Sequence, residues 1–301
     1  MKLNVQLHLH TIESKTQNIP AESVIHPKLA IDTAKKNGID VIAVTDHNTT
    51  RKISSVKDFA EKKGIIIIKG IEIDTDSGHL IGFGVDEEIE KKIKLGIDLL
   101  ETADLIKDFG GEVYIPHPFD IRKKGVGPRV KEVDGIIEVF NSMNIFGFEN
   151  KYADIVADKL KKPKAVGADA HTLSMIPRCI TVVDAEPDEY SIIKNIKQGN
   201  VEFKNCTYMT LREFKEWILT RISLSYDDII KSIQNGWEPD EWYTILANSR
   251  LIKPLEKAVL EFGIRTKKSR LWDFVTYSSY IFAYFYSELS KREFNAFICT
   301  L

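Results

Sequence analysis

The sequence predicts an α/β barrel over residues 1–204, followed by a helical region over residues 205–301. Short apolar runs alternate with amphipathic helix patterns in the first part, as in repeated strand–helix units. Polar residues and histidines follow at least five of these apolar runs. After about residue 205 glycine becomes rare, strand patterns stop and aromatic residues cluster. The two parts therefore have different architectures.

The strand–helix units can be followed along the chain. We expect strands at residues 3–7, 40–45, 65–73, 80–85, 113–116, 135–140, 164–167 and 179–183. We expect helices at residues 28–37, 53–63, 95–109, 150–161 and 188–198, several of them ended by a glycine such as Gly38, Gly64 or Gly199. Repeated units of this kind imply parallel strands with right-handed crossovers.

The polar residues at the strand ends favour a barrel over an open sheet. An open sheet gathers its ligands from two or three strands at a switch point, whereas a barrel gathers them from the carboxyl ends of many strands. At least five strands contribute here.

The chain has seven histidines, and only His26 lies outside a predicted strand end. His8 and His10 are two residues apart, so on a strand their side chains point to the same side, as in a metal chelate. The other strand-end histidines are His47, His79, His117 and His171, and the neighbouring carboxylates are Asp46, Glu72 and Asp169. Nitrogen and carboxylate donors together suit zinc, manganese or iron.

These residues occur in a series of motifs: H-x-H-T at 8–11, T-D-H-N-T at 45–49, G-I-E at 70–72, H-L-I-G-F-G at 79–84, P-H-P-F at 116–119 and G-A-D-A-H at 167–171. Together and in this order, the series resembles the polymerase and histidinol phosphatase (PHP) family of metal-dependent phosphoesterases. The resemblance covers about residues 1–204 and implies a distorted (β/α)7 barrel. Residues 205–301 form a helical region to which the resemblance assigns no role.

The resemblance also implies how the ligands divide among metal ions. One ion would be held by His8, His10, Glu72 and Asp169, a second by Glu72, His79 and His117, and a third would draw on His47 and His171. Glu72 would bridge the first two ions. Asp46 is left between ligation and a supporting role, either holding His47 or capping the next helix.

The third site departs from the family pattern. Many relatives carry an aspartate shortly after H-x-H-T-x-x-S, but here Ser14 is followed by Lys15-Thr16-Gln17-Asn18. Either Glu13 supplies the missing ligand and Lys15 faces solvent, or Lys15 places a positive charge in the pocket and the centre is dinuclear.

Two arginines complete the predicted catalytic set with Glu72 and Asp169. Arg122 follows the P-H-P-F motif and Arg178 follows the loop of Asp169. A guanidinium group is a planar clamp for phosphate, although either arginine could instead form a surface ion pair. Lys123 and Lys124 could widen this basic rim, and Asn141 ends a strand where its side chain could face the pocket.

Composition narrows the classes of function. A net charge of −2 excludes a global basic field, so any nucleic-acid contact would be local. Three widely spaced cysteines fit small buried residues in a reducing compartment. With no signal peptide or membrane-length apolar run, we expect a cytoplasmic protein.

The leading hypothesis is a metal-dependent phosphoesterase, a phosphatase or an exonuclease. It would use two or three divalent ions to hydrolyse a phosphate ester of a small molecule, a nucleotide or an oligonucleotide end. The alternatives are an amidohydrolase-like metal hydrolase and a non-catalytic module in which metals are structural. We expect the aromatic run of residues 272–286 to form core or a dimer face, so a homo-oligomer through the helical region is also expected.

Overall fold

The structure is a computed structural model that describes residues 1–14, 22–50, 53–94, 96–122, 124–144, 146–217, 220–221, 224 and 290–301. Lys15, Lys123 and the aromatic run of residues 272–286 lie outside these ranges. Most of the helical region expected after residue 217 also lies outside these ranges. Within the described ranges, no helix is both long enough and apolar enough to cross a lipid bilayer.

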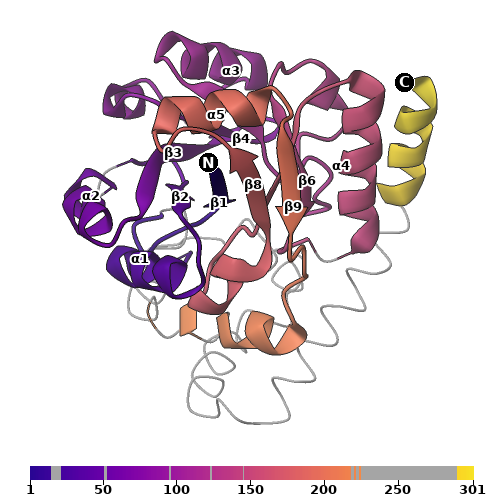
Figure 1. The fold of residues 1–301 in the computed structure, drawn as a ribbon. Coiled ribbons are helices and arrows are strands. Elements are labelled where there is room, and N and C mark those ends of the chain that lie inside the picture. The colour runs from indigo at the N-terminus through magenta and orange to yellow at the C-terminus, as the bar shows by residue number, and fades with distance from the viewer. Residues whose placement is uncertain are drawn as a thin grey trace, which may run out of the picture.

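One mixed sheet of nine described strands forms the centre of the molecule, in the order β7-β6-β5-β4-β3-β2-β1-β8-β9. Its strands are β1 (Lys2–Gln6), β2 (Val41–Val44), β3 (Ile66–Thr75), β4 (Gly78–Phe83), β5 (Glu112–Ile115), β6 (Ile136–Asn141), β7 (Lys164–Gly167), β8 (Ile180–Asp184) and β9 (Val201–Lys204). The helices are α1 (Pro27–Lys36), α2 (Ile53–Lys62), α3 (Leu99–Asp108), α4 (Gly147–Leu160) and α5 (Glu189–Lys197). Figure 1 shows α1 to α4 around the outside of the sheet, whereas α5 packs against β3, β7 and β8.

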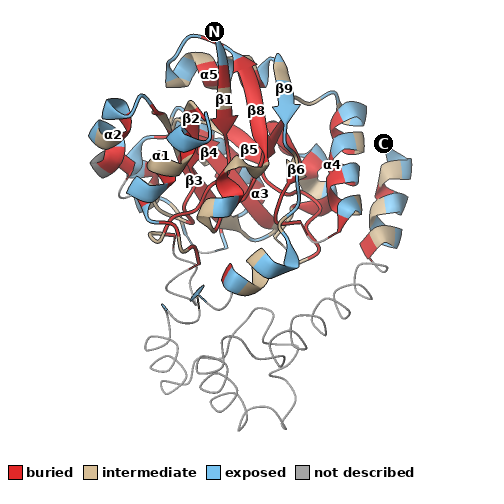
Figure 2. Cartoon of the chain, turned by 60° about the horizontal axis from the view of Figure 1, so that its bottom comes forward, coloured by how far each residue is buried: buried red, intermediate tan, exposed pale blue. Residues whose placement is uncertain are grey.

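Both faces of the sheet are buried except at the edge strand β9, which Figure 2 shows in pale blue beside the red interior. In β2, Ile42 and Val44 pack in one apolar cluster, while Val41 and Ala43 pack in a second cluster with Ile192 of α5. Successive strand side chains point to opposite faces, so two buried faces require an uninterrupted apolar run. This is why β2 is apolar at every position.

The sheet is nearly closed, because side chains bridge the gap between β7 and β8. The Thr181 hydroxyl donates to the Val166 carbonyl and accepts from the Val166 amide, both at 3.0 Å. An isolated parallel bridge between Leu9 and Ala170 joins the residues that follow β1 and β7. The prediction of an α/β barrel is therefore confirmed. The sheet has nine described strands, so the (β/α)7 count that the resemblance implies is not confirmed.

The sequence predicted that all strands would be parallel, but some strand pairs are antiparallel. β3 and β4 pair in antiparallel fashion, with Thr75 opposite Gly78, and β4 is also antiparallel to β5. Only Asp76 and Ser77 separate β3 from β4, too few residues for a crossover, so a hairpin is the only connection possible. β8 is antiparallel to both β1 and β9, and β9 was not expected from the sequence.

Two described helical stretches come from the C-terminal region. Residues 290–300 pack beside α4, where the Tyr152 hydroxyl donates to Asn295 Oδ1 at 2.7 Å and the rings of Phe119 and Phe294 are 5.0 Å apart. Residues 211–217 form a short helix below the start of β8 and the carboxyl end of β9 in Figure 1. The barrel and the C-terminal region therefore contact each other, although the sequence predicts a division between them at residue 204.

Replacing Thr181 with valine should weaken closure of the barrel. Valine keeps the shape of threonine but leaves the buried amide and carbonyl of Val166 without their partner. We expect the free energy of unfolding to fall by about 1–3 kcal/mol. Urea denaturation measures it, with Thr33→Val on the outer helix α1 as the control; equal stability of the two variants would contradict the role of Thr181.

Candidate metal centre

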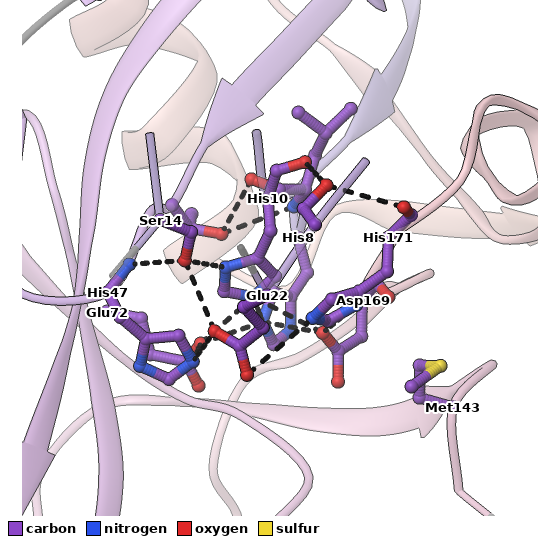
Figure 3. A network of polar contacts seen from close by, with 12 residues as sticks. His8, His10, Ser14, Glu22, His47, Glu72, Met143, Asp169 and His171 are labelled. Atoms are coloured by element: carbon purple, nitrogen blue, oxygen red, sulfur yellow. Dashed lines mark hydrogen bonds and ion pairs between the residues drawn. The ribbon is translucent and has the colours of Figure 1, made fainter. Parts of the chain in front are cut away.

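Nine histidine and acidic side chains converge at one end of the sheet (Figure 3). We refer to them as the histidine–carboxylate cluster: His8, His10, Glu22, His47, Glu72, His79, His117, Asp169 and His171. Eight were predicted from the sequence, and Glu22 was not. All nine residues are buried. The structure therefore brings together side chains that the motifs scatter over more than half of the chain.

Glu72 lies at the middle of this cluster, and its two oxygens face different histidines. Oε2 is 3.0 Å from His10 Nε2 and 3.2 Å from His47 Nε2. Oε1 is 2.9 Å from His79 Nδ1 and 3.2 Å from His117 Nε2. A carboxylate with a separate set of donors at each oxygen has the geometry of a bridging ligand, as the family resemblance implies for Glu72.

His8 and His10 form one side of the cluster. Their Nε2 atoms are 3.1 Å apart, and Asp169 Oδ1 is 3.5 Å from the first and 3.3 Å from the second. The other ring nitrogen of His8, Nδ1, is 3.0 Å from Glu138 Oε1. A carboxylate behind a histidine fixes its tautomer and turns the remaining nitrogen toward a metal position.

Glu138 was missed by the sequence interpretation. It is buried and also accepts from the Tyr114 hydroxyl at 2.9 Å and from the His117 amide at 2.7 Å. A charged residue within the apolar run I-I-E-V-F was a signal, because an unpaired charge is not placed inside a buried strand.

Glu22 supplies the carboxylate that seemed to be missing at the third site. Its Oε2 is 3.2 Å from His47 Nε2 and accepts from the Ser14 hydroxyl at 3.3 Å, and its Oε1 is 3.9 Å from His171 Nε2. Figure 3 shows Glu22 between these histidines. The sequence interpretation left Glu13 and Lys15 as alternatives at this site and missed Glu22, which lies farther along the chain than the family pattern suggests.

The donor set fits divalent metal ions. Five groups of three donors lie within 4.8 Å of one another: His8–His10–Glu72, His8–His117–Asp169, His10–Asp169–His171, His10–Glu22–His47 and His47–Glu72–His79. His117 Nδ1 is buried and has no hydrogen-bond partner among the described residues. His117 and Asp169 also have positive φ angles of 27° and 52°, a strained conformation that is concentrated at functional sites.

Histidines and carboxylates within the cluster stabilise each other's charged forms. Burial would lower the pKa of His47, but Glu22, Glu72 and Asp74 outweigh burial and raise this pKa to about 10. Burial would raise the pKa of Glu72, but the nearby histidines, led by His47, hold it well below its usual range. A proton on His47 therefore balances part of the carboxylate charge where metal ions would otherwise do so.

Asp46 does not join the cluster. Its Oδ1 accepts from the Thr11 amide at 2.5 Å and its Oδ2 from the Thr11 hydroxyl at 2.7 Å, and burial raises its pKa to about 6. The predicted ligand role is therefore not supported by its position. Neither predicted supporting role is observed: Asp46 holds the loop after His8 and His10 rather than His47.

The two predicted phosphate-binding arginines have different surroundings. Arg122 is largely buried and donates from Nε and Nη2 to Asp120. Arg178 instead forms a bidentate ion pair with Glu213, at 2.6 Å to each oxygen. This pair turns Arg178 toward the C-terminal region, as in the ion-pair alternative, and its phosphate contact stays a prediction.

Two further side chains border the cluster. Asn141 Nδ2 donates to Asp169 Oδ2 at 3.3 Å and to Glu138 Oε2 at 2.8 Å, so the side chain faces the cluster as the sequence suggested. Lys124 Nζ is 3.7 Å from Glu22 Oε1. A lysine therefore lies beside Glu22 at the third site, where the sequence analysis considered Lys15. This lysine comes from the loop after β5.

An α/β barrel with buried histidines and carboxylates at the strand ends defines a metal-dependent hydrolase. A family described as PHP-associated matches residues 147–201 of the chain. The uncharacterized protein MJ1587 of Methanocaldococcus jannaschii is 35% identical over 156 residues, which cover 50% of this chain and 89% of that protein. The chain therefore belongs to the PHP family.

Two other proteins are similar to the chain. The 3′,5′-nucleoside bisphosphate phosphatase of Chromobacterium violaceum is 28% identical over 87 residues, and the match covers 28% of each protein. The crystal structure of PsfC from Pseudomonas syringae aligns with a TM-score of 0.54 and 18% identity, covering 74% of this chain and 99% of that chain. This last likeness shows the fold alone.

Metal binding should release protons, because ligating histidines must be neutral. His47, with its pKa of about 10, carries a proton at neutral pH in the metal-free protein. That proton stabilises the metal-free fold. Its contribution to stability is complete below the pKa of histidine in the unfolded chain and is lost as the pH rises through about 10. The apparent metal affinity should therefore increase as the pH is raised toward this value.

Calorimetric titration of metal-stripped protein with manganese, in buffers of different ionisation enthalpy, measures the released protons. We expect the observed heat to depend on the buffer in the wild-type protein and equally in a His26→Gln control. A heat independent of the buffer, with metal bound, would contradict protonation of the cluster.

Proposed function

We propose that this protein is a metal-dependent phosphoesterase that hydrolyses a phosphate ester with metal-activated water. The observation that carries the proposal is the position of Glu72, whose two oxygens face separate histidine sets in a cluster bordered by Arg122 and Lys124. A carboxylate between two metal positions is typical of sites for in-line phosphoryl transfer. Positive side chains at the border favour an anionic substrate.

The proposed ligand assignment takes its first two sets from the family resemblance and adds Glu22 to the third from its contacts with His47 and His171. We assign His8, His10, Glu72 and Asp169 to one metal position, Glu72, His79 and His117 to a second, and Glu22, His47 and His171 to a third. Zinc, manganese or iron suits these nitrogen and oxygen donors. Bound there, such ions would lower the pKa of a coordinated water and neutralise phosphate oxygens.

The chain's own residues hold and orient the substrate. Arg122 is fixed by Asp120 through Nε and Nη2, which leaves its planar group held at one edge and available at the other. Asp169 is among the charges that raise the pKa of Arg122, which supports a position of the guanidinium near the cluster. Asn141 orients Asp169 by donating to its Oδ2.

The alternatives are less well supported by the contacts. Amidohydrolase barrels usually have a carboxylated lysine or an equivalent group as the bridge, whereas the central position here belongs to Glu72. A purely structural metal site would not require the strained backbone of His117 and Asp169. By analogy with the related nucleoside bisphosphate phosphatase, we propose that the substrate is a phosphorylated small molecule, a nucleotide or an oligonucleotide end.

The function is tested by metal analysis together with a panel of phosphate esters. Purified protein loaded with zinc, manganese or iron should contain at least two ions per chain and hydrolyse one or more members of a panel of nucleotides, sugar phosphates and short single strands. An amide panel run in parallel addresses the amidohydrolase alternative. Fewer than one ion per chain, or no phosphoester hydrolysis, would overturn the proposal.

Glu72→Gln should nearly abolish phosphoester hydrolysis while the fold persists. The neutral amide removes the negative charge that faces histidines on both sides, so both metal positions weaken together. Hydrolysis and bound metal are measured on the same sample. Glu13→Gln, at a nearby half-buried acidic residue, is the control and should retain both. Near-normal turnover by Glu72→Gln would show that Glu72 does not bridge.

Arg122→Ala should weaken the binding of phosphate substrates far more than that of metal. The guanidinium is an anion clamp and offers no lone pair to a metal ion. We expect KM to rise by about tenfold or more, corresponding to the loss of about 1.5–3 kcal/mol for a charged hydrogen bond. Arg129→Ala, which removes a more exposed ion pair with Glu132, is the matched control. Loss of metal with normal KM would contradict the assignment.

A further inference from the structure

We propose that Trp217 is a positioning residue of the metal centre, contributed by the region that follows the barrel. It would hold the third group of donors, Glu22 and His171, in place. This inference rests on the proposed function, because it takes that group as a metal position. It assigns a role to part of residues 205–301, for which the family resemblance offers none.

The side chain of Trp217 contacts this group from behind. The indole Nε1 donates to the backbone carbonyl of Glu22 at 2.9 Å, and the indole ring lies edge-on to the His171 ring at 5.0 Å. Trp217 is only 6% exposed. A buried indole N–H needs an acceptor, so this bond couples the helix of residues 211–217 directly to a cluster residue.

Glu22 depends on such anchoring because it comes from a loop and not from a strand. The next residues are tied to the strand-end loops: Ser23 Oγ donates to the His10 carbonyl at 2.7 Å, and the Val24 amide donates to the His171 carbonyl at 3.1 Å. The Trp217 bond is made to Glu22 itself. A ligand that is not fixed by a sheet needs such contacts to hold its geometry.

The helix that carries Trp217 is itself fixed to the barrel by Arg178. The guanidinium pairs with both oxygens of Glu213, and its Nη1 donates to the Tyr208 carbonyl at 2.9 Å. Glu213 and Trp217 are four residues apart, so they lie on the same face of the helix. The Glu213 carboxylate also accepts from the Thr210 amide at 2.9 Å, at the start of this helix.

These contacts form a continuous connection from the barrel to the cluster. Arg178 lies at the end of the loop that follows Asp169 and His171, and it holds Glu213; Trp217, one turn later, returns to Glu22 and His171. The helix of residues 211–217 therefore belongs to the metal centre, although the sequence places it in a different region.

The test compares metal binding by the metal-stripped full chain and by three variants. Trp217→Phe keeps an aromatic ring but removes the N–H donor, and Trp217→Ala removes both. Tyr152→Phe is the matched control, because it also loses one aromatic hydrogen bond to the C-terminal region, at Asn295, away from the cluster. Calorimetric titration with manganese and with zinc gives the number and affinity of sites.

We expect Trp217→Phe to weaken one class of metal sites by about tenfold, and Trp217→Ala to weaken it further, as for other groups that orient ligands. The remaining sites and the Tyr152→Phe variant should match the wild type. Glu213→Gln, which loosens the helix without touching the cluster, should shift the same class of sites if Trp217→Ala does not fold. Unchanged site number and affinity in Trp217→Phe would overturn the inference.

The same experiment separates this inference from the proposed function. If the wild type binds metal and hydrolyses phosphate esters but Trp217→Phe binds metal equally well, only the role of Trp217 fails. If Trp217→Phe loses a metal site while no phosphoester is hydrolysed by the wild type, the role of Trp217 stands and the proposed reaction fails.

Discussion

A single buried carboxylate sets the requirements for the rest of the site. The Glu72 side chain is 1% exposed and lies within 3.4 Å of nitrogens from five histidines: His8, His10, His47, His79 and His117. A buried carboxylate is costly unless positive charge and hydrogen bonds surround it. Only a closed arrangement of strands brings donors to it from so many directions. The nearly closed sheet is therefore a condition for the cluster as well as a way to bury apolar side chains.

The mixed strand directions serve the same geometry. A parallel strand presents its carboxyl end to the site, as β1 and β2 do with the histidines that follow them. β4 runs antiparallel to β3, so the start of β4 lies beside the end of β3, and Asp74 is paired with His79. His79 therefore reaches Glu72 from the beginning of its strand. The hairpin required by the two-residue turn places another histidine at the same edge of the sheet.

The sequence predicted those parts of the fold and site that depend on local spacing. The alternation of two in H-x-H places both imidazoles on one side, and the apolar runs before Asp46, Glu72 and Asp169 mark strand ends. Strand directions were missed because periodicity carries no information on pairing partners. Glu22, Glu138 and Trp217 were missed because their roles depend on contacts across long sequence separations, such as the 195 residues between Glu22 and Trp217. Arg178 was singled out as a candidate phosphate contact, but its ion pair with Glu213 was not visible in any motif.

Gly167 shows how packing behind the cluster constrains a motif that seems to concern only ligands. A Cβ atom at this position would lie 2.6 Å from His8 Cβ and would also collide with the Glu138 carboxylate. Any side chain here would displace the pair in which Glu138 holds His8 Nδ1. Because that pair orients the His8 ring toward Glu72 and Asp169, the glycine that begins G-A-D-A-H is required by the backbone of β7 lying directly against a cluster histidine. The ligand aspartate and the packing glycine therefore belong to one structural requirement, set by how closely β7 approaches β1.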